Sequence, residues 1–287
     1  MFYFISSSHF EDRIWFRCND DYRAAMNYVA IVAHRTHTTV LAFVLMSNHV
    51  HFLVSSDGRE RAMAFYNLFK TLYSRYFCRK YRERRFFRDN GVDIRAINRD
   101  GEGIETVTAY ILMNPVAANI SYNAALYPWG SGRCFFSETM PSGRRVAELS
   151  KRERIRLFHS KLDAVDDWLV TEEGYILPET YVAVKFVESV YRSARRLNYF
   201  LQSSSKARAK IEGVETALPT FRDPSLLAFA EDFCMSTFRK QKIQDLEDKQ
   251  LALLIYELRR RSGADVGQIS RVLSVSPDIV AAILSSY

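Results

Sequence analysis

The fold of this 287-residue chain is decided by the stretch TVLAFVLMSNHVHFLVS, which spans residues 39–55. It contains two apolar runs, 39–46 and 48–55, and each has the length and the β-branched and aromatic content of a strand. The two runs meet at the polar pair Ser47-Asn48. We therefore predict two strands joined as a hairpin, whose register the sequence leaves open.

The second predicted strand carries two histidines, His49 and His51. Strand side chains alternate between faces, so both imidazoles should point one way while Val50 and Phe52 point the other way. Two imidazoles on one face are costly to bury unless something binds them, and a divalent metal is the commonest such partner. Two ordinary histidines at a sheet surface are the alternative for this pair taken alone.

The order of the neighbouring elements predicts the fold class. Apolar spacing predicts a strand at 2–5, a helix capped by Asp20 or Asp21, a long helix over 60–81, and a strand or loop over 86–97 before a last helix. This β-α-β-β-α-β order is typical of a ferredoxin-like α+β sandwich, with one antiparallel sheet and helices on one face.

That last helix, over 104–119, carries Tyr110 and Asn114 one turn apart on one face. Pro115 has no backbone donor, so we expect the first helical stretch to kink or end close to Asn114. On this segment alone, Tyr110 is explained as a core tyrosine and Asn114 as a helix-end residue.

Taken together, these segments resemble the single-tyrosine HUH transposases, in particular the REP-associated tyrosine transposases of bacteria. The family pattern is a strand ending in Met-x-Asn-His-hydrophobic-His, a helix with Tyr-Ile-x-x-Asn-Pro-Val-x-Ala, and a Trp-Ser-Ser element. The chain keeps this order over 46–51, 110–118 and 129–131. Gly130 stands where the first serine is expected, which puts the local geometry in question. The resemblance covers residues 1–140.

The resemblance implies transesterification on single-stranded DNA, with Tyr110 as the nucleophile and a 5′-phosphotyrosine as the intermediate. It implies a metal on His49 and His51, and we expect Asn114 as the third ligand because it shares a helical face with Tyr110. A free tyrosine has a pKa of about 10, so a nearby cation would help to stabilise its ionised form. Mixed nitrogen and oxygen ligands favour Mg²⁺ or Mn²⁺, and zinc stays open.

The composition favours an anionic partner. Lys and Arg number 40 against 33 Asp and Glu, which gives a net charge of +7. Four cysteines without a Cys-x-x-Cys pair indicate reduced thiols. No apolar segment approaches the roughly 20 residues that span a bilayer. We expect a cytoplasmic protein that binds single-stranded or hairpin DNA, with no membrane or small-molecule cofactor, as a monomer or alternatively a dimer.

Residues 79–88 are the main candidate for contact with DNA. Six of these ten residues are basic, and the interleaved aromatic side chains could stack on unpaired bases. A solvated helix end is the alternative. Arg144-Arg145 and a basic helix that begins at Lys151 are second candidates. The predicted DNA-binding residues are Arg79, Lys80, Arg82, Arg84, Arg85 and Arg88.

Beyond the linker signal at 141–143 the chain is predicted to be mostly helical. We divide it into a nuclease domain at 1–140, a helical extension at 141–240 and a helix-turn-helix-like DNA-binding unit at 241–287. Predicted helices begin after Ser150, at Pro178, where one long helix should run to Phe200, and at Pro224. The last three span 250–261, 266–273 and 277–284. The third of these has few base-reading side chains, so DNA contact and plain packing both stay open for it.

Three functions compete on these observations. The first is a metal-dependent nickase and strand transferase that acts at hairpin-forming DNA. The second is a DNA-binding protein without catalysis, which would have no need for the histidines, Tyr110 and Asn114 together. The third is a metal-dependent hydrolase that uses water, for which Tyr110 would be dispensable.

Overall fold

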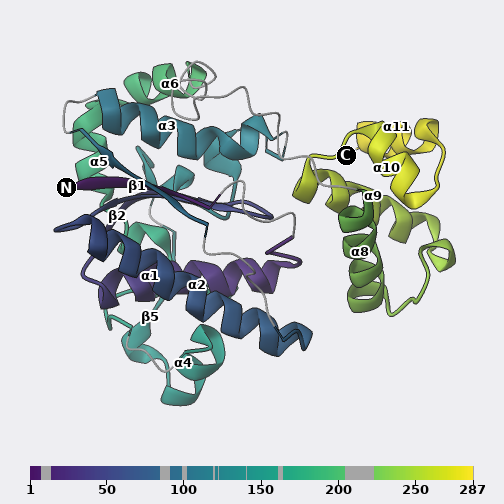
Figure 1. Cartoon of the computed structure of the whole chain (residues 1–287), viewed down its shortest axis with the longest axis horizontal. Helices are drawn as coiled ribbons and strands as arrows, with labels where there is room; N and C mark the ends of the chain where they lie inside the picture. The colour runs from purple at the N-terminus through teal and green to yellow at the C-terminus, as the bar shows by residue number, and fades with distance from the viewer. Residues whose placement is uncertain are drawn as a thin grey trace.

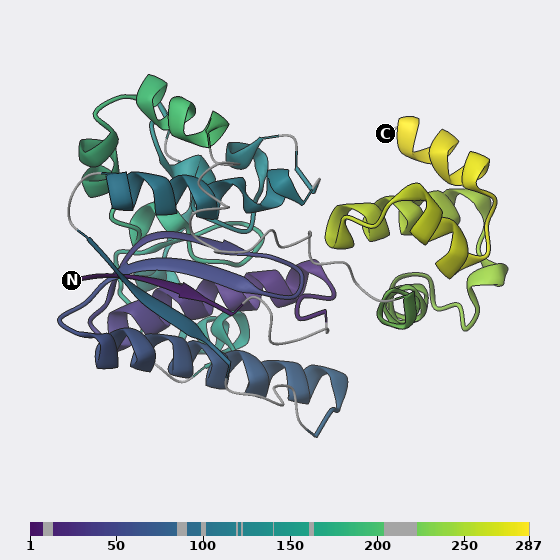
Figure 2. The same cartoon turned by 45° about the horizontal axis from the view of Figure 1, so that its top comes forward.

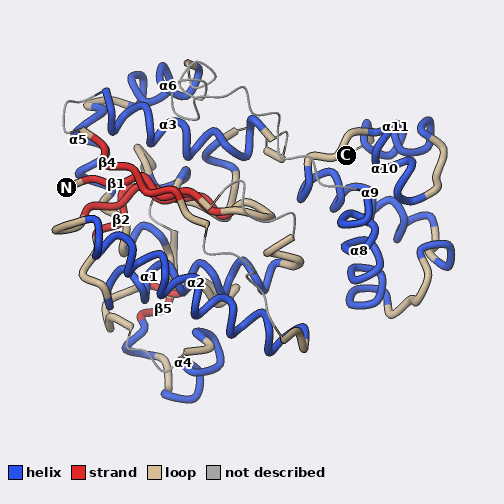
Figure 3. Tube along the Cα trace, in the orientation of Figure 1, coloured by secondary structure: helices blue, strands red, loops and turns tan. Residues whose placement is uncertain are grey.

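The computed structural model describes residues 1–7, 14–84, 91–98, 102–118, 120–121, 123–139, 141–160, 164–203 and 223–286. Figure 1 shows a larger part built around a sheet and a smaller helical unit that contains the C-terminus. Figure 3 shows that the strands lie together between layers of helices. The architecture is therefore α+β with a helical C-terminal part.

The main sheet is antiparallel throughout, in the order β2-β3-β1-β4. Neighbouring strands β2 and β3 form the predicted hairpin, and the Met46 N–H donates to the His49 carbonyl at 2.8 Å across its turn. Strand order and element order together confirm the ferredoxin-like arrangement. The strands are β1 (Phe2–Ser6), β2 (Thr39–Leu45), β3 (Val50–Ser55) and β4 (Asp93–Ile97).

Helices cover both faces of this sheet. Helices α1 (Asn19–Arg35) and α2 (Arg59–Tyr81) lie on one side, and α3 (Glu102–Ala117) lies on the other (Figure 1). The two helices of the β-α-β-β-α-β unit therefore share one face as predicted, and α3, which follows that unit, covers the second face of strands that are buried on both sides. This places the tyrosine helix against the face opposite to α1 and α2.

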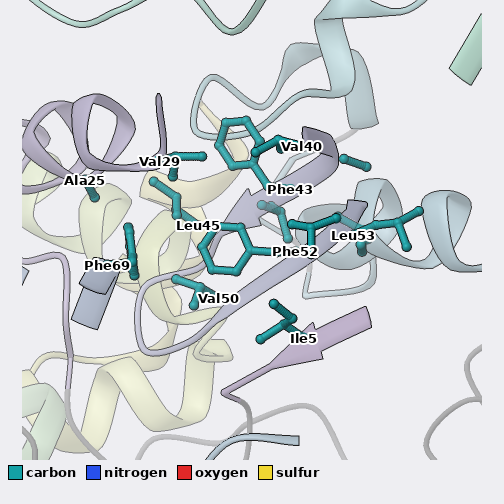
Figure 4. Packing of buried hydrophobic residues seen from close by; sticks show 14 of the residues in the cluster. Ile5, Ala25, Val29, Val40, Phe43, Leu45, Val50, Phe52, Leu53 and Phe69 are labelled. Carbon is teal, nitrogen blue, oxygen red and sulfur yellow. The ribbon is translucent and has the colours of Figure 1, made fainter. Parts of the chain in front are cut away.

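The core between the sheet and α1 and α2 is aromatic. Phe52 of β3 meets Phe65 and Phe69 of α2 edge to face, at centroid distances of 5.2 and 5.3 Å. Figure 4 shows Phe52 and Phe43 among aliphatic side chains of the sheet, with Val29 and Phe69 beside them. Burial of such rings stabilises the fold and leaves the other side of β3 for different residues.

Two helix boundaries differ from the sequence prediction. Helix α1 is capped by Cys18 rather than by Asp20 or Asp21, and the Asp21 carboxylate accepts the backbone N–H groups of Arg17 and Cys18 from inside the first turn. Helix α3 continues past Asn114 and Pro115 to Ala117, so of the two expected effects of Pro115, a kink or an end of the helix, the structure excludes the end.

The segment after residue 140 is less helical than predicted. A short antiparallel pair joins β5 (Arg144–Arg145) to β6 (Leu169–Val170). Ser150 does cap α4 (Lys151–Phe158), as expected. The predicted long helix from Pro178 to Phe200 is wrong: it is divided into α5 (Val184–Tyr191) and α6 (Ala194–Gln202). Arg192 adopts a left-handed conformation with φ of 63°, and Ser193 caps the second helix.

The C-terminal unit has a core of its own. Helix α8 (Asp223–Phe233) packs with α9 (Asp248–Ser262), α10 (Val266–Leu273) and α11 (Pro277–Ser285), and Ile14 joins their apolar cluster. Figure 2 shows this unit beside the end of the sheet layer. By contrast, five buried side chains between residues 175 and 197 belong to the same cluster as the main sheet, namely Tyr175, Val182, Val187, Tyr191 and Leu197. The division of the chain at 140 and 240 stays a prediction.

None of the helices in the described ranges is long and apolar enough to cross a bilayer.

Candidate active site

The two motif histidines lie side by side on the α3 face of the sheet. Their ring centroids are 4.9 Å apart with the planes nearly perpendicular. His51 belongs to β3, and His49 immediately precedes it. Both are buried, with 5% of His49 and 1% of His51 exposed. The predicted alternation of side chains is confirmed, because Phe52 points instead to α2.

Tyr110 of α3 packs against His51 of this pair. Its ring centroid is 5.3 Å from that of His51, with an edge-to-face angle of 73°. Only 4% of Tyr110 is exposed. Two motifs that are distant in the sequence therefore meet at the interface between the sheet and α3.

Asn114 sits one helical turn after Tyr110 and is half-buried. Its side-chain amide nitrogen donates to the Tyr110 carbonyl at 2.9 Å. This bond adds a local contact just before Pro115, whose missing N–H removes a helical hydrogen bond. Because the nitrogen is used in this way, the amide oxygen is the atom of Asn114 suited to ligate a cation.

Two further residues of the site were not predicted. Phe4 of β1 stacks on His51 at 5.6 Å and meets Tyr110 edge to face at 5.7 Å, so it fixes both rings. Asn48 Oδ1 lies 2.7 Å from His49 Nδ1 and accepts its proton. That hydrogen bond leaves Nε2 of His49 with its lone pair, the form that binds metals. Asn48 was visible in the motif next to His49, whereas Phe4 reaches the site only through strand pairing.

Helix α3 is held in place from its outer side. The Glu105 carboxylate is 2% exposed and receives two hydrogen bonds from Arg196 of α6, at 2.7 and 3.1 Å. The Tyr191 hydroxyl of α5 donates to the Glu105 carbonyl. Residues beyond 140 therefore fix the helix that carries Tyr110.

The departure at Gly130 has a steric reason. Gly130 bridges to Val44 of β2, and a Cβ at this position would lie 2.8 Å from the Phe43 carbonyl oxygen. Ser131 is fully buried and its hydroxyl accepts the Phe43 N–H at 3.0 Å. The 129–131 element thus covers the outer edge of β2, and only glycine fits at its closest approach.

The side chains around Tyr110 offer nitrogen and oxygen donors for a divalent cation. Among the described residues, no three His, Cys, Asp or Glu side chains converge as a metal cluster. The candidate set instead consists of two imidazoles, one of them already oriented by Asn48, and the amide of Asn114. Two nitrogens and one oxygen leave coordination positions open for phosphate and water, which fits the predicted chemistry.

The predicted DNA-binding residues differ in their surroundings. Lys80 is held by the buried Asp21 carboxylate at 2.7 Å. Arg79, Arg82 and Arg84 are exposed, and among the described residues none of them has an ion-pair partner. Arg85 and Arg88 lie outside the residues that the structure describes.

The second group of basic candidates is partly neutralised. Three of its arginines are in ion pairs at 2.7 to 2.9 Å. In the part of the chain described here, Lys151, Arg152 and Arg156 have no such partner. The three pairs are Arg144 with Glu153, Arg145 with Glu148, and Arg154 with Asp166.

The last three helices, α9, α10 and α11, form at the predicted positions. Two polar side chains of α10 are engaged within the protein. Gln268 and Arg271 of α10 both bond to Asp223 of α8, at 3.0 and 3.3 Å. Helix α11 presents Asp278 and Ile279 to solvent and carries no basic residue. A DNA-contacting role of this unit stays a prediction.

A family model matches the segment that holds both histidines and Tyr110. Residues 13–112 match the family described as IS200-like transposases. A solved structure, described as the REP-associated tyrosine transposase bound to a REP hairpin, is similar over 45% of this chain and 75% of its own. Its sequence identity is 14% and its TM-score is 0.34. No curated protein matches the chain. The family match confirms the resemblance for the segment that carries His49, His51 and Tyr110.

Proposed function

We propose, from the premise that residues 13–112 are an IS200-like transposase segment, that this protein cleaves and rejoins single-stranded DNA. One observation supports the proposal most directly. The ring centroid of Tyr110 lies 5.3 Å from that of His51, and the His51 ring lies next to the His49 ring. A nucleophile and a candidate metal pair are thereby brought together from two separate motifs. The substrate we propose is DNA with a hairpin next to a single-stranded stretch, as the motif resemblance implies.

The proposed step is a transesterification at phosphorus. The Tyr110 oxygen forms a bond to the scissile phosphorus as its hydroxyl proton leaves, and the bond to the 3′-oxygen breaks. The 3′-oxygen takes up a proton and departs as a free hydroxyl, while the 5′-phosphate stays on Tyr110. A phosphodiester is exchanged for another ester, so a new 3′-hydroxyl can reverse the step without a nucleotide cofactor.

His49, His51 and Asn114 are the residues that would hold Mg²⁺ or Mn²⁺ in this proposal. A bound divalent cation would supply positive charge beside the phosphate oxygens, where negative charge develops. The chain's own contribution is orientation. Asn48 sets the tautomer of His49, and Phe4 limits the movement of His51 and Tyr110.

The test is a search for a covalent adduct. The full-length protein is incubated with a labelled hairpin oligonucleotide and Mn²⁺, and then separated on a denaturing gel. We expect an adduct with wild type and none with Tyr110→Phe, which removes only the nucleophilic oxygen. Cleavage without any adduct would favour the hydrolase, and binding without cleavage would favour the non-catalytic protein.

Tyr127→Phe is a suitable control. The Tyr127 hydroxyl is buried and donates to the Leu45 carbonyl at 2.7 Å, and burial raises its pKa well above the ordinary value. It is therefore a structural tyrosine and its loss should leave the adduct in place. Adduct formation that persists in Tyr110→Phe would overturn the assignment, and Tyr122 would be the next candidate.

A further inference from the structure

A cavity of about 340 Å³ lies on the face of the molecule opposite to Tyr110. Residues of α1, α2 and α4 line it, together with the segment around Gly174. Four cationic side chains line it, against the carboxylates of Asp20 and Glu173. The cationic lining residues are Arg23, Lys80, Arg79 and Arg156.

Two of these four cations form ion pairs within the described residues, and the other two do not. Arg23 pairs with Asp20 at 2.8 Å, and Lys80 pairs with Asp21 at 2.7 Å. Arg79 and Arg156 come from different helices, and neither has a carboxylate partner among the described residues. Two guanidinium groups that line one cavity and form no ion pair with a described residue favour an anion with several acceptor oxygens, of which a phosphate is the best match.

The walls of the cavity are fixed by buried contacts. Asn27 of α1 is fully buried, and its amide nitrogen donates to the carbonyls of Leu157 and Gly174, each at 3.1 Å. Its oxygen accepts the N–H of Ile176 at 2.7 Å. These bonds hold the end of α4 and the Gly174 segment against α1. The arginines are therefore presented by a rigid frame.

His159 also lines the cavity, and the pKa of its imidazole responds to the charges around it. It follows α4 in a left-handed conformation, and its ring lies 5.0 Å from that of Tyr76. Partial burial, followed by the positive charges of Arg79 and Lys80, lowers the pKa of His159, against an opposing effect of Asp20. A bound anion would offset the positive charge and raise this pKa again.

We propose that this cavity binds a phosphate of the DNA backbone, at a point of the substrate distant from the cleaved bond. The proposal rests on the proposed function for the identity of the ligand. In this proposal Arg79 and Arg156 bind the same phosphate, on the side of the sheet that α3 does not cover. The DNA would then be held at the cavity while its single-stranded part reaches Tyr110 around the sheet.

The first test compares affinity for a fluorescent hairpin oligonucleotide in EDTA, where no metal-dependent cleavage occurs. We expect the double variant Arg79→Gln/Arg156→Gln to bind at least fivefold more weakly than wild type near 0.1 M salt. The slope of log affinity against log salt should become shallower by about 0.8, which corresponds to one phosphate. The charge-matched control is Arg59→Gln/Arg75→Gln, because both residues are exposed on α2 and neither lines the cavity.

The second test follows the His159 ring by NMR, with His159→Gln to assign its signal. Both the oligonucleotide and inorganic phosphate should raise the His159 pKa in wild type, and neither should do so in the Arg79/Arg156 variant. Equal affinity of the two double variants for the hairpin would overturn the proposal. A His159 pKa that does not change when the oligonucleotide is added would also overturn it. A response to inorganic phosphate alone would overturn the assignment to DNA. Because these readouts need no cleavage, they stand independently of the Tyr110 adduct.

Discussion

At the scale of single residues, the proposed metal site has only three protein ligands, so its metal affinity should depend strongly on each of them. His49, His51 and Asn114 are the complete proposed ligand set, so the loss of one imidazole should abolish measurable Mn²⁺ binding. Asn114→Ala should weaken binding less, because water can replace an amide oxygen. Calorimetric titration of the full-length variants with Mn²⁺ tests this order. Unchanged affinity in His49→Ala or His51→Ala would rule out the site.

Asn48 gives a second prediction at the same scale. Its side chain accepts the Nδ1 proton of His49 and thereby presents Nε2 to the site. We expect Asn48→Ala to lower Mn²⁺ affinity roughly 10- to 100-fold with the fold intact, the usual effect of losing such an orienting partner. Asn67→Ala, on the exposed side of α2, is the matched control. Equal affinities in the two variants would mean that Asn48 does not orient the ligand.

At the scale of elements, the 129–131 segment acts as an edge cover for β2. A methyl group at Gly130 would meet the Phe43 carbonyl at 2.8 Å, and backbone cannot rotate away as a side chain does. We expect Gly130→Ala to reduce the free energy of unfolding by about 1–3 kcal/mol, the usual cost of overpacking. Gly58→Ala is the control, since nothing lies within 4 Å of its added Cβ. Thermal and urea unfolding should separate the two variants; equal midpoints would contradict the steric argument.

At the scale of the whole molecule, the C-terminal helices contact the part that carries the site. Arg17 binds Asp232 and Glu83, both at 2.8 Å. Gly263 ends α9 so close to α3 that an added Cβ would lie 2.6 Å from the Ala118 carbonyl oxygen. The helix that carries Tyr110 therefore ends against the C-terminal unit.

Removal of residues 241–287 tests how independent the two parts are. The cut removes α9, α10 and α11, which supply most of the apolar cluster that buries Leu226, Phe229 and Ile14. We expect the shortened protein to bind a hydrophobic dye more strongly and hairpin DNA more weakly. Adduct formation at saturating oligonucleotide should persist, because every proposed site residue precedes residue 120. Full-length affinity, or complete loss of the adduct in a protein that stays folded, would contradict this division of roles.

The sequence by itself determined the strands of the main sheet, most helices and the candidate residues His49, His51, Tyr110 and Asn114, because these follow from local periodicity and from motifs. Alternation along β3 placed both histidines on one face, and i, i+4 spacing placed Asn114 with Tyr110. Local patterns fail where backbone conformation depends on distant contacts. The break at Arg192 and the course of α3 past Pro115 belong to this class, since the surrounding packing compensates for each local cost.

Only the tertiary structure decided which groups meet. Strand order β2-β3-β1-β4 brings Phe4 beside His51, and the cover of both sheet faces brings Tyr110 against His51. The same folding joins Arg79 to Arg156 around one cavity and pairs Lys80 with a buried carboxylate. A sequence lists charges and rings, but their partners depend on long-range packing. That packing is what separates an arginine available to DNA from one already neutralised.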